Sequence, residues 1–248
     1  RDRSNSIISP IYIDAGTKEL SVGSNKVAEG GLFTTSAEIG EDGCLVTAFQ
    51  KRNVDIGLIR ISVIKGAQTF LYEHLLVNDS NMYDEATDMA YDPVSNQFAL
   101  LYVTAIDSDP NQLPPMPTLT IHVIQFSVKC EANAQVQVIG DTANITTIAN
   151  RRELSYAIRQ SQLANSAFLA TYSDAVSTYM LDISSSNDVN KVKLPDNAGK
   201  IPNNVDIAWL QTPSCGLAVV VAETDNDTSL ILVDETLNLF NCSDAQTS

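Results

Sequence analysis

The feature that most constrains the fold is a strand pattern that recurs four times, and residues 205–240 show it most clearly. A short strand contains Ala208, a turn follows, and residues 217–221 form an unbroken apolar run. A polar loop leads to a second apolar segment at residues 229–234, and a last short strand at residues 237–240 closes the unit. Short apolar segments bounded by turn residues are typical of β-strands. The chain is therefore predicted to be all-β, with four-stranded antiparallel units.

Three earlier units repeat this pattern along the chain. Alignment of the four units places a small residue on each first strand, at Ala37, Ala90, Ala157 and Ala208. The residues that open the second strands are Leu45, Phe98, Phe168 and Leu217. Residues 150–159 have some helical propensity. The alignment places them on a first strand instead, so we expect no helix there.

Repeated units of four antiparallel strands at this spacing resemble the blades of a β-propeller. In a propeller the first strands converge on the central axis, where a small side chain avoids collision. The second and third strands are covered on both faces, which explains the apolar runs at residues 100–103 and 219–221. The alternative is a tandem β-sandwich, which also has many short strands but needs no small residue at a fixed position.

The predicted blades cover residues 31–80, 81–145, 146–199 and 200–248. Residues 1–30 are expected to form an N-terminal hairpin that resembles the second half of a blade, because residues 11–14 parallel residues 231–234. A half blade leaves open strand edges, which strands of another molecule or of a longer chain could complete. A closed four-bladed ring with an added hairpin is the third arrangement. The start at Arg1, without Met or an apolar leader, indicates a processed or partial chain.

Glycosylation triplets and cysteines indicate the compartment. Four Asn-x-Ser/Thr triplets fall in predicted turns or at strand ends and favour a secreted glycoprotein over chance triplets in a cytosolic or bacterial protein; they begin at Asn78, Asn144, Asn226 and Asn241. The cysteines lack the spacing of a zinc site. We predict two sequential disulfides, in keeping with an oxidising compartment, from Cys44, Cys130, Cys215 and Cys242.

The charge of the chain excludes several partners. With 30 acidic and 15 basic residues the formal net charge is -15 at pH 7. Nucleic-acid recognition needs a Lys/Arg surface, and so does docking on anionic lipid, so neither is expected. The longest apolar run, residues 217–222, is far shorter than the roughly 20 residues of a membrane helix, so no membrane insertion is expected.

Two acidic residues are the candidates for catalysis. Asp88 and Asp206 each stand two positions before the repeated alanine, so both are predicted to lie near the axis, with Glu38 and Asp14 nearby. A pair of carboxyl groups is what glycoside hydrolysis requires. The competing interpretation is an acidic channel lining without chemistry. Trp209, the single tryptophan, offers little aromatic platform for a sugar and is expected in the core.

Other polar groups carry weaker signals. Glu223, Asp225 and Asp227 form an acidic loop that could hold calcium, but the loop lacks EF-hand spacing and glycine, and Asp and Asn are common in turns. Calcium is the one cofactor that the sequence suggests. The two histidines, His74 and His122, lie on predicted strands and are expected to be packed rather than catalytic.

These observations lead to one expected function and two alternatives. We expect an extracellular binding or assembly module, structural or adhesive, that works through protein–protein contacts and strand sharing between molecules rather than as an enzyme. The first alternative is a glycan-active hydrolase with Asp88 and Asp206 as its carboxylates and a carbohydrate as its ligand. The second is a calcium-dependent adhesive protein.

Overall fold

The computed structural model of the chain is all-β. It describes residues 6–8, 11–13, 16–17, 20–22, 26–28, 32–40, 44–53, 56–65, 72–83, 87–106, 117–130, 135–148, 154–163, 165–174, 177–194, 204–209, 218–223 and 228–233. Among these residues there is no helix long and apolar enough to cross a membrane.

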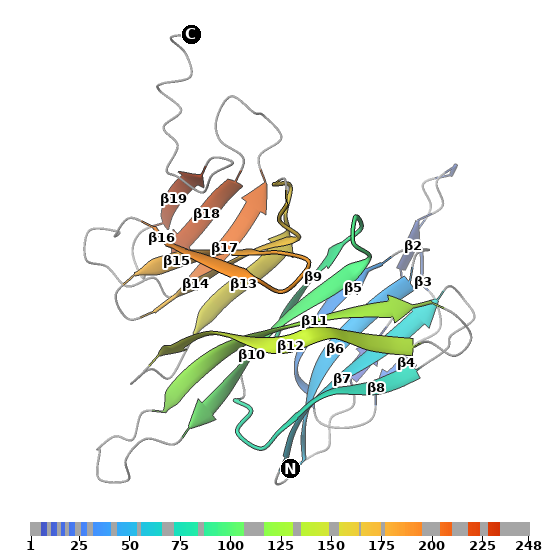
Figure 1. The fold of residues 1–248 in the computed structure, drawn as a ribbon. Coiled ribbons are helices and arrows are strands. Elements are labelled where there is room, and N and C mark those ends of the chain that lie inside the picture. The colour runs from blue at the N-terminus through green and yellow to red at the C-terminus, as the bar shows by residue number, and fades with distance from the viewer. Residues whose placement is uncertain are drawn as a thin grey trace.

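Four antiparallel sheets follow one another along the chain, and in each the strands lie in chain order (Figure 1). The first sheet contains β5 (Leu32–Ile39), β6 (Cys44–Asn53), β7 (Ile56–Lys65) and β8 (Tyr72–Asp79). The second contains β9 (Asp88–Asp92), β10 (Gln97–Ile106), β11 (Thr118–Lys129) and β12 (Gln135–Ile148). The third contains β13 (Ser155–Gln160), β14 (Phe168–Ser173), β15 (Thr178–Ile183) and β16 (Val189–Lys193). The fourth contains β17 (Asn204–Trp209), β18 (Ala218–Glu223) and β19 (Thr228–Val233).

The predicted four-stranded units are confirmed for the first three sheets. The predicted last strand of the fourth unit, residues 237–240, lies outside the described residues. Residues 155–160 form a strand, as the repeat alignment predicted against their helical propensity. None of the sheets closes on itself within the described part of the chain.

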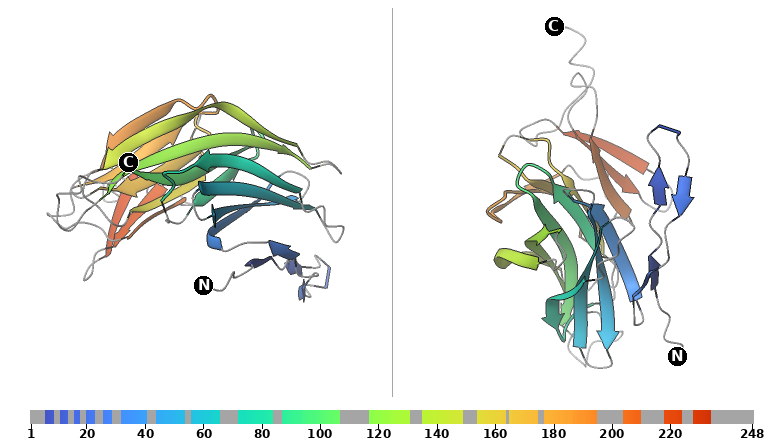
Figure 2. Two further views of the ribbon diagram at one scale, coloured as in Figure 1. Left: turned by 90° about the horizontal axis from the view of Figure 1, so that it is seen from below. Right: turned by 90° about the vertical axis from the view of Figure 1, so that its right-hand side faces the viewer.

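The N-terminal strands form two small sheets of their own, seen on one side of the molecule in Figure 2. β2 (Ile11–Ile13) pairs with β3 (Leu20–Val22) across a turn that includes residues 16 and 17, which confirms the predicted hairpin. β1 (Ser6–Ile8) pairs with β4 (Lys26–Ala28), so the two chain segments pair again on the side away from the turn.

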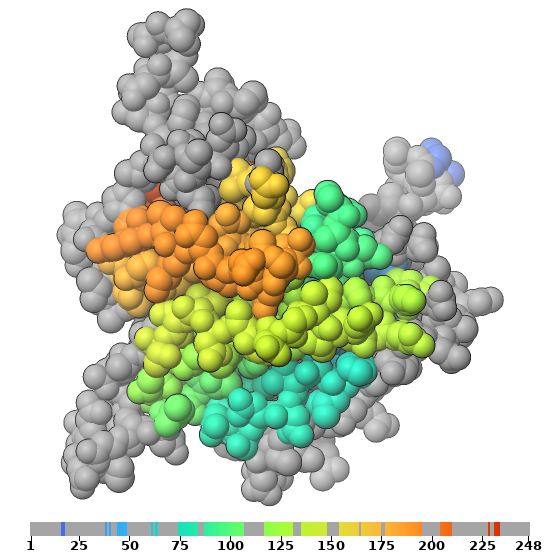
Figure 3. Space-filling view, viewed as in Figure 1, coloured from blue at the N-terminus to red at the C-terminus, as the bar shows by residue number. Residues whose placement is uncertain are grey.

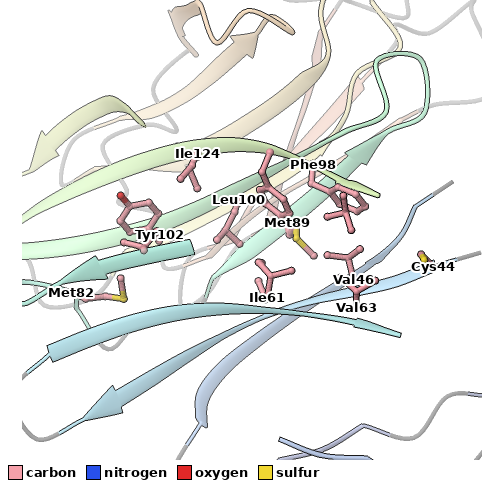
Figure 4. Packing of buried hydrophobic residues seen from close by; sticks show 14 residues of the cluster. Cys44, Val46, Ile61, Val63, Met82, Met89, Phe98, Leu100, Tyr102 and Ile124 are labelled. Atoms are coloured by element: carbon pink, nitrogen blue, oxygen red, sulfur yellow. The ribbon is translucent and has the colours of Figure 1, made fainter. Parts of the chain in front are cut away.

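Among the described residues, three hydrophobic cores lie between the four sheets. The first core lies between the first and second sheets and contains Ile61, Met89 and Phe98 (Figure 4). The second core lies between the second and third sheets, and the third core lies between the third and fourth. Each core is made by side chains from two sheets that are consecutive in the chain.

The second and third sheets are therefore covered on both faces. Along β10, Leu100 points into the first core and Leu101 into the second. Along β14, Phe168 faces the second core and Leu169 the third. Because successive side chains of a strand point to opposite faces, a strand between two cores buries both of its sides. The prediction of a continuously apolar strand is confirmed for residues 100–103, whereas β14 also buries Thr171 and Ser173, and the side chains of residues 219–221 lie outside the described ones.

The repeated alanine is buried at two of its four positions, and the side chain of Ala37 lies outside the described ones. Ala90 is 2% exposed within the second core, and Ala157 is 4% exposed within the third. These residues lie where the first strands of neighbouring sheets approach each other, β9 beside β13 and β13 beside β17. Ala208, at the equivalent place on β17, is exposed. A small side chain is thus explained by the close approach of two first strands.

One of the two predicted disulfides is confirmed. Cys44, at the start of β6, is bonded to Cys130, which directly follows β11, so the disulfide joins the first sheet to the second. Cys215 and Cys242 lie outside the described residues.

The glycosylation triplets are only partly placed as predicted. Asn78 is exposed near the end of β8. Asn144 is exposed within β12, so its predicted position in a turn or at a strand end is wrong. The repeat predicts a strand at residues 135–139, and β12 is longer because it continues through a bulge at Gly140, which has a φ of 65°. Asn226 and Asn241 lie outside the described residues.

Candidate functional site

The first strands of the four sheets each supply one charged side chain to a common region. The strands adjoin in chain order, with β5 beside β9, β9 beside β13 and β13 beside β17. We call the four residues the first-strand cluster; they are Glu38 on β5, Asp88 on β9, Arg159 on β13 and Asp206 on β17.

The Asp88 carboxylate accepts three hydrogen bonds. Its Oδ2 accepts hydrogen bonds from the backbone N–H of Ile158 and from Arg159 Nη1, each at 2.9 Å. Its Oδ1 accepts a hydrogen bond from the backbone N–H of Met89 at 3.0 Å. Both oxygens of the carboxylate are thus engaged, and two of the three donors come from β13 in the next sheet.

Arg159 joins two carboxylates that come from different sheets. Its Nη1 contacts Asp88, and its Nη2 lies 2.7 Å from Asp206 Oδ1. The Asp88 side chain is 29% exposed, whereas the Asp206 side chain is 57% exposed. The contact with Asp88 is therefore the stronger one, because water screens the exposed pair more effectively.

The electrostatic setting favours protonation of two carboxyl groups. Burial raises the pKa of Asp88, and this outweighs the hydrogen bonds from Ile158 and Arg159 that lower it. Burial also raises the pKa of Glu38; the negative charge of Asp88 raises it further, and Arg159 lowers it. A carboxyl group with a raised pKa can act as a general acid, and one held by arginine can act as a structural tie.

Neutral hydrogen bonds reinforce the junction of the third and fourth sheets. Ser155 Oγ donates to Asn204 Oδ1 at 2.8 Å and accepts from the backbone N–H of Val205 at 2.7 Å. Trp209 is half-buried, packs against the third core, and donates from its indole N–H to the backbone oxygen of Gln160. The first strands β13 and β17 are thus joined along their length.

The structure brings some of the predicted site residues together. Asp88 and Asp206 meet at Arg159, with Glu38 close enough for its pKa to respond to both Asp88 and Arg159. The sequence analysis missed Arg159. The signal available was its place on a first strand, two positions after the repeated Ala157. Asp14 lies outside the described residues.

The calcium loop is not described by the structure. Asp225 and Asp227 lie outside the described residues, and Glu223 is placed only as the last residue of β18. In the described part of the chain no group of three or more His, Cys, Asp or Glu side chains is arranged to hold a metal ion.

A second polar group crosses the second sheet at His122 on β11. The ring stacks on Tyr102 with a centroid distance of 4.9 Å. Its Nδ1 donates to Asn144 Oδ1 at 2.7 Å, so in the neutral ring Nε2 accepts from Thr104 Oγ1, also at 2.7 Å. Burial lowers the pKa of His122. The histidine is thus held between β10 and β12 by its ring contacts. His74 lies on β8, half-buried.

Compared with known proteins, the chain matches no family model and no curated protein sequence.

Proposed function

We propose that this chain is a β-propeller module of a secreted protein, and that it acts by binding partners or assembling with copies of itself. The observation that carries this proposal is the Asp88–Arg159–Asp206 bridge, which joins the first strands of three successive sheets. It aligns the first strands at one place, as blades around an axis require. It also engages the two carboxylates that a hydrolase would need.

The burial of two sheets on both faces favours a propeller over the sandwich alternative. A sandwich packs two sheets on one core, and each sheet turns its other face outward. Here three cores follow one another, and the second and third sheets each contribute to two of them. Continued stacking of sheets in chain order is the expectation for blades.

The fourth sheet supports assembly. On the first strands of the second and third sheets the repeated alanine is buried by the following sheet, whereas Ala208 and the Asp206 side chain on β17 are exposed. A radial ring needs a further sheet on this face. The N-terminal strands of this chain or of a second copy could supply it, and strand sharing between copies is a known form of such completion.

The disulfide and the glycosylation acceptors support the proposed extracellular compartment. A disulfide between Cys44 and Cys130 fits an oxidising environment such as the outside of the cell. The exposed acceptors Asn78 and Asn144 fit a chain that passes through the secretory pathway. Both observations agree with a binding or structural protein outside the cell.

Assembly can be tested with the full chain. We expect light scattering after size exclusion to show a mass that increases with concentration. A peptide of residues 1–30 should compete for the open face and return the chain to monomer. The control peptide carries Ile11→Lys and Ile13→Lys and should not compete. A chain that stays monomeric at every concentration, with or without the peptide, would contradict strand sharing.

The hydrolase is kept as the second candidate because Glu38 and Asp88 lie on neighbouring first strands and both have a raised pKa. A glycoside hydrolase needs one such protonated carboxyl group as its acid. The test is hydrolysis of a polysaccharide panel by the intact chain and by Glu38→Gln, Asp88→Asn and Asp206→Asn variants. Activity lost in these variants would favour the enzyme. No activity in the intact chain would remove it.

A further inference from the structure

The outer strands of the first three sheets differ in how their free edges are protected. Within the described residues β8, β12 and β16 each pair on one side only. A free edge presents unpaired backbone N–H and C=O groups that can pair with another chain, and short length or exposed lysine discourages this. β16 has five residues and carries exposed Lys191 and Lys193. Its edge is therefore protected by its own sequence.

β12 lacks both of these protections. It has 14 residues and crosses the face of the molecule between β8 and β16, as the space-filling view shows (Figure 3). Asp141 is its only charged residue, and Val138 is 41% exposed. The pairing of β12 with β11 is interrupted twice, around Gly140 and at Ile145, and it continues on both sides of each interruption. Asn187 Nδ2 donates to the backbone oxygen of Asp141, and the rest of this long, nearly uncharged edge is a site where chains can associate.

Asn144 lies on this edge and begins the triplet Asn144-Ile145-Thr146. The side chain is exposed, and its Oδ1 accepts the hydrogen bond from His122 Nδ1. This contact uses the carboxamide oxygen and not Nδ2, the atom to which an N-linked glycan is attached. The second acceptor in the described part of the chain, Asn78, is also exposed and also lies on an outer strand, β8.

We propose that Asn144 carries an N-linked glycan and that this glycan shields the edge of β12 from pairing with other chains. The inference rests on the proposed secretory compartment. The donor is a lipid-diphosphate-linked oligosaccharide. A bond forms between the anomeric carbon and Asn144 Nδ2, the bond between that carbon and the phosphate oxygen breaks, and the Nδ2 proton is lost as the lipid diphosphate leaves. Assembly is then directed away from β12 and toward the fourth sheet.

The test is expression of the full chain, with an added signal peptide, in cultured animal cells. Peptide mass spectrometry should find a glycan on Asn144 in the unmodified chain and in Thr146→Ser, which keeps the acceptor triplet. Asn144→Gln and Thr146→Ala should lose it. Thr146 is hydrogen-bonded to Tyr172. Thr146→Ala also removes that contact, so only an effect shared by both unglycosylated variants is assigned to the glycan.

Light scattering gives the second readout. Both unglycosylated variants should associate at lower protein concentration than Thr146→Ser does. Adding Val138→Lys to Asn144→Gln should suppress this association, because a lysine on the edge replaces the shield. If an unglycosylated variant is not secreted, the glycan of the folded chain is trimmed to one sugar with an endoglycosidase, and the same association is expected.

Two results would overturn the inference. One is an unmodified Asn144 in the secreted chain. The other is association by the unglycosylated or trimmed chain that matches Thr146→Ser at every concentration. Neither result bears on the assembly of the intact chain through residues 1–30, which the peptide competition measures separately. The inference and the proposed function can therefore fail independently.

Discussion

Replacement of Arg159 by methionine tests whether the first-strand cluster holds the sheets together. Methionine keeps much of the apolar stem and removes both charged contacts. The contact with Asp88 is partly buried, so we assign it about 1.5 kcal/mol, in the range for a hydrogen bond between charged groups. The Asp206 contact is more exposed, and we assign it about 0.5 kcal/mol. Arg159→Met should therefore lower the free energy of unfolding by about 2 kcal/mol, which lowers Tm by about 4–8 °C in a chain of this length.

The assay is urea unfolding at pH 7 with thermal unfolding alongside. Asp206→Asn is the matched control and should cost about 0.5 kcal/mol. A double-mutant cycle should give a larger coupling energy for Arg159 with Asp88 than for Arg159 with Asp206.

The sign of the pH dependence of folding stability follows from the raised pKa of Asp88. Because the pKa of Asp88 is raised in the folded state, that state binds the proton more tightly than the unfolded chain does. The contribution of Asp88 itself is therefore favourable at low pH and is lost as the pH rises through its folded pKa. Protonation of Asp88 removes the charge that Arg159 contacts. The difference between Arg159→Met and the unmodified chain should thus shrink as pH falls through the carboxyl range. A difference within about 0.3 kcal/mol at pH 7, or one that grows in acid, would refute the reasoning.

Three further predictions concern the cores and the histidine. Replacing both Cys44 and Cys130 by serine removes a disulfide between residues 86 positions apart, and should lower the free energy of urea unfolding by about 4.5 kcal/mol through the entropy of the unfolded chain. Phe168→Ala removes a fully buried ring from the second core and should cost about 3–5 kcal/mol in the same assay. Burial lowers the pKa of His122 from 6.5, so the unfolded state binds more protons and stability should fall as pH drops below that value. His122→Gln should flatten this slope in the pH dependence of the unfolding free energy; an unchanged slope would contradict the assignment.

Local pattern was enough to predict most strands. Apolar segments and turn residues repeat at short range, so the strands of the first three sheets and the β2–β3 hairpin could be predicted without any knowledge of their neighbours. β12 was predicted too short, because the bulge at Gly140 breaks the alternation on which the prediction depends. The alignment of the four units also could not predict the pairing register between first and second strands. Phe98 pairs with Tyr91 and Phe168 with Gln160, which stand at different distances from the repeated alanine.

The candidate site also contains residues that the sequence could predict and one that it could not. Asp88 and Asp206 were predicted because they share a position in the repeat, and position in a strand is a local property. Arg159 was missed because its role depends on which first strands adjoin. Its partner Asp88 is 71 positions away in the chain, and Asp206 is 47 positions away. The pattern within a single unit carries no information about contacts between residues so far apart in the chain.

The sequence by itself determined that this chain forms strands, how they group into consecutive units, and which acidic positions recur, because backbone alternation and turn chemistry act over a few residues. The tertiary structure decided what those positions face. Stacking of the sheets buried Ala90 and Ala157, brought Asp88 and Asp206 to one arginine, and placed Asn144 on an exposed edge. The physical reason is that burial and ion pairing are set by neighbouring sheets, and contacts between sheets join residues that are remote in the chain.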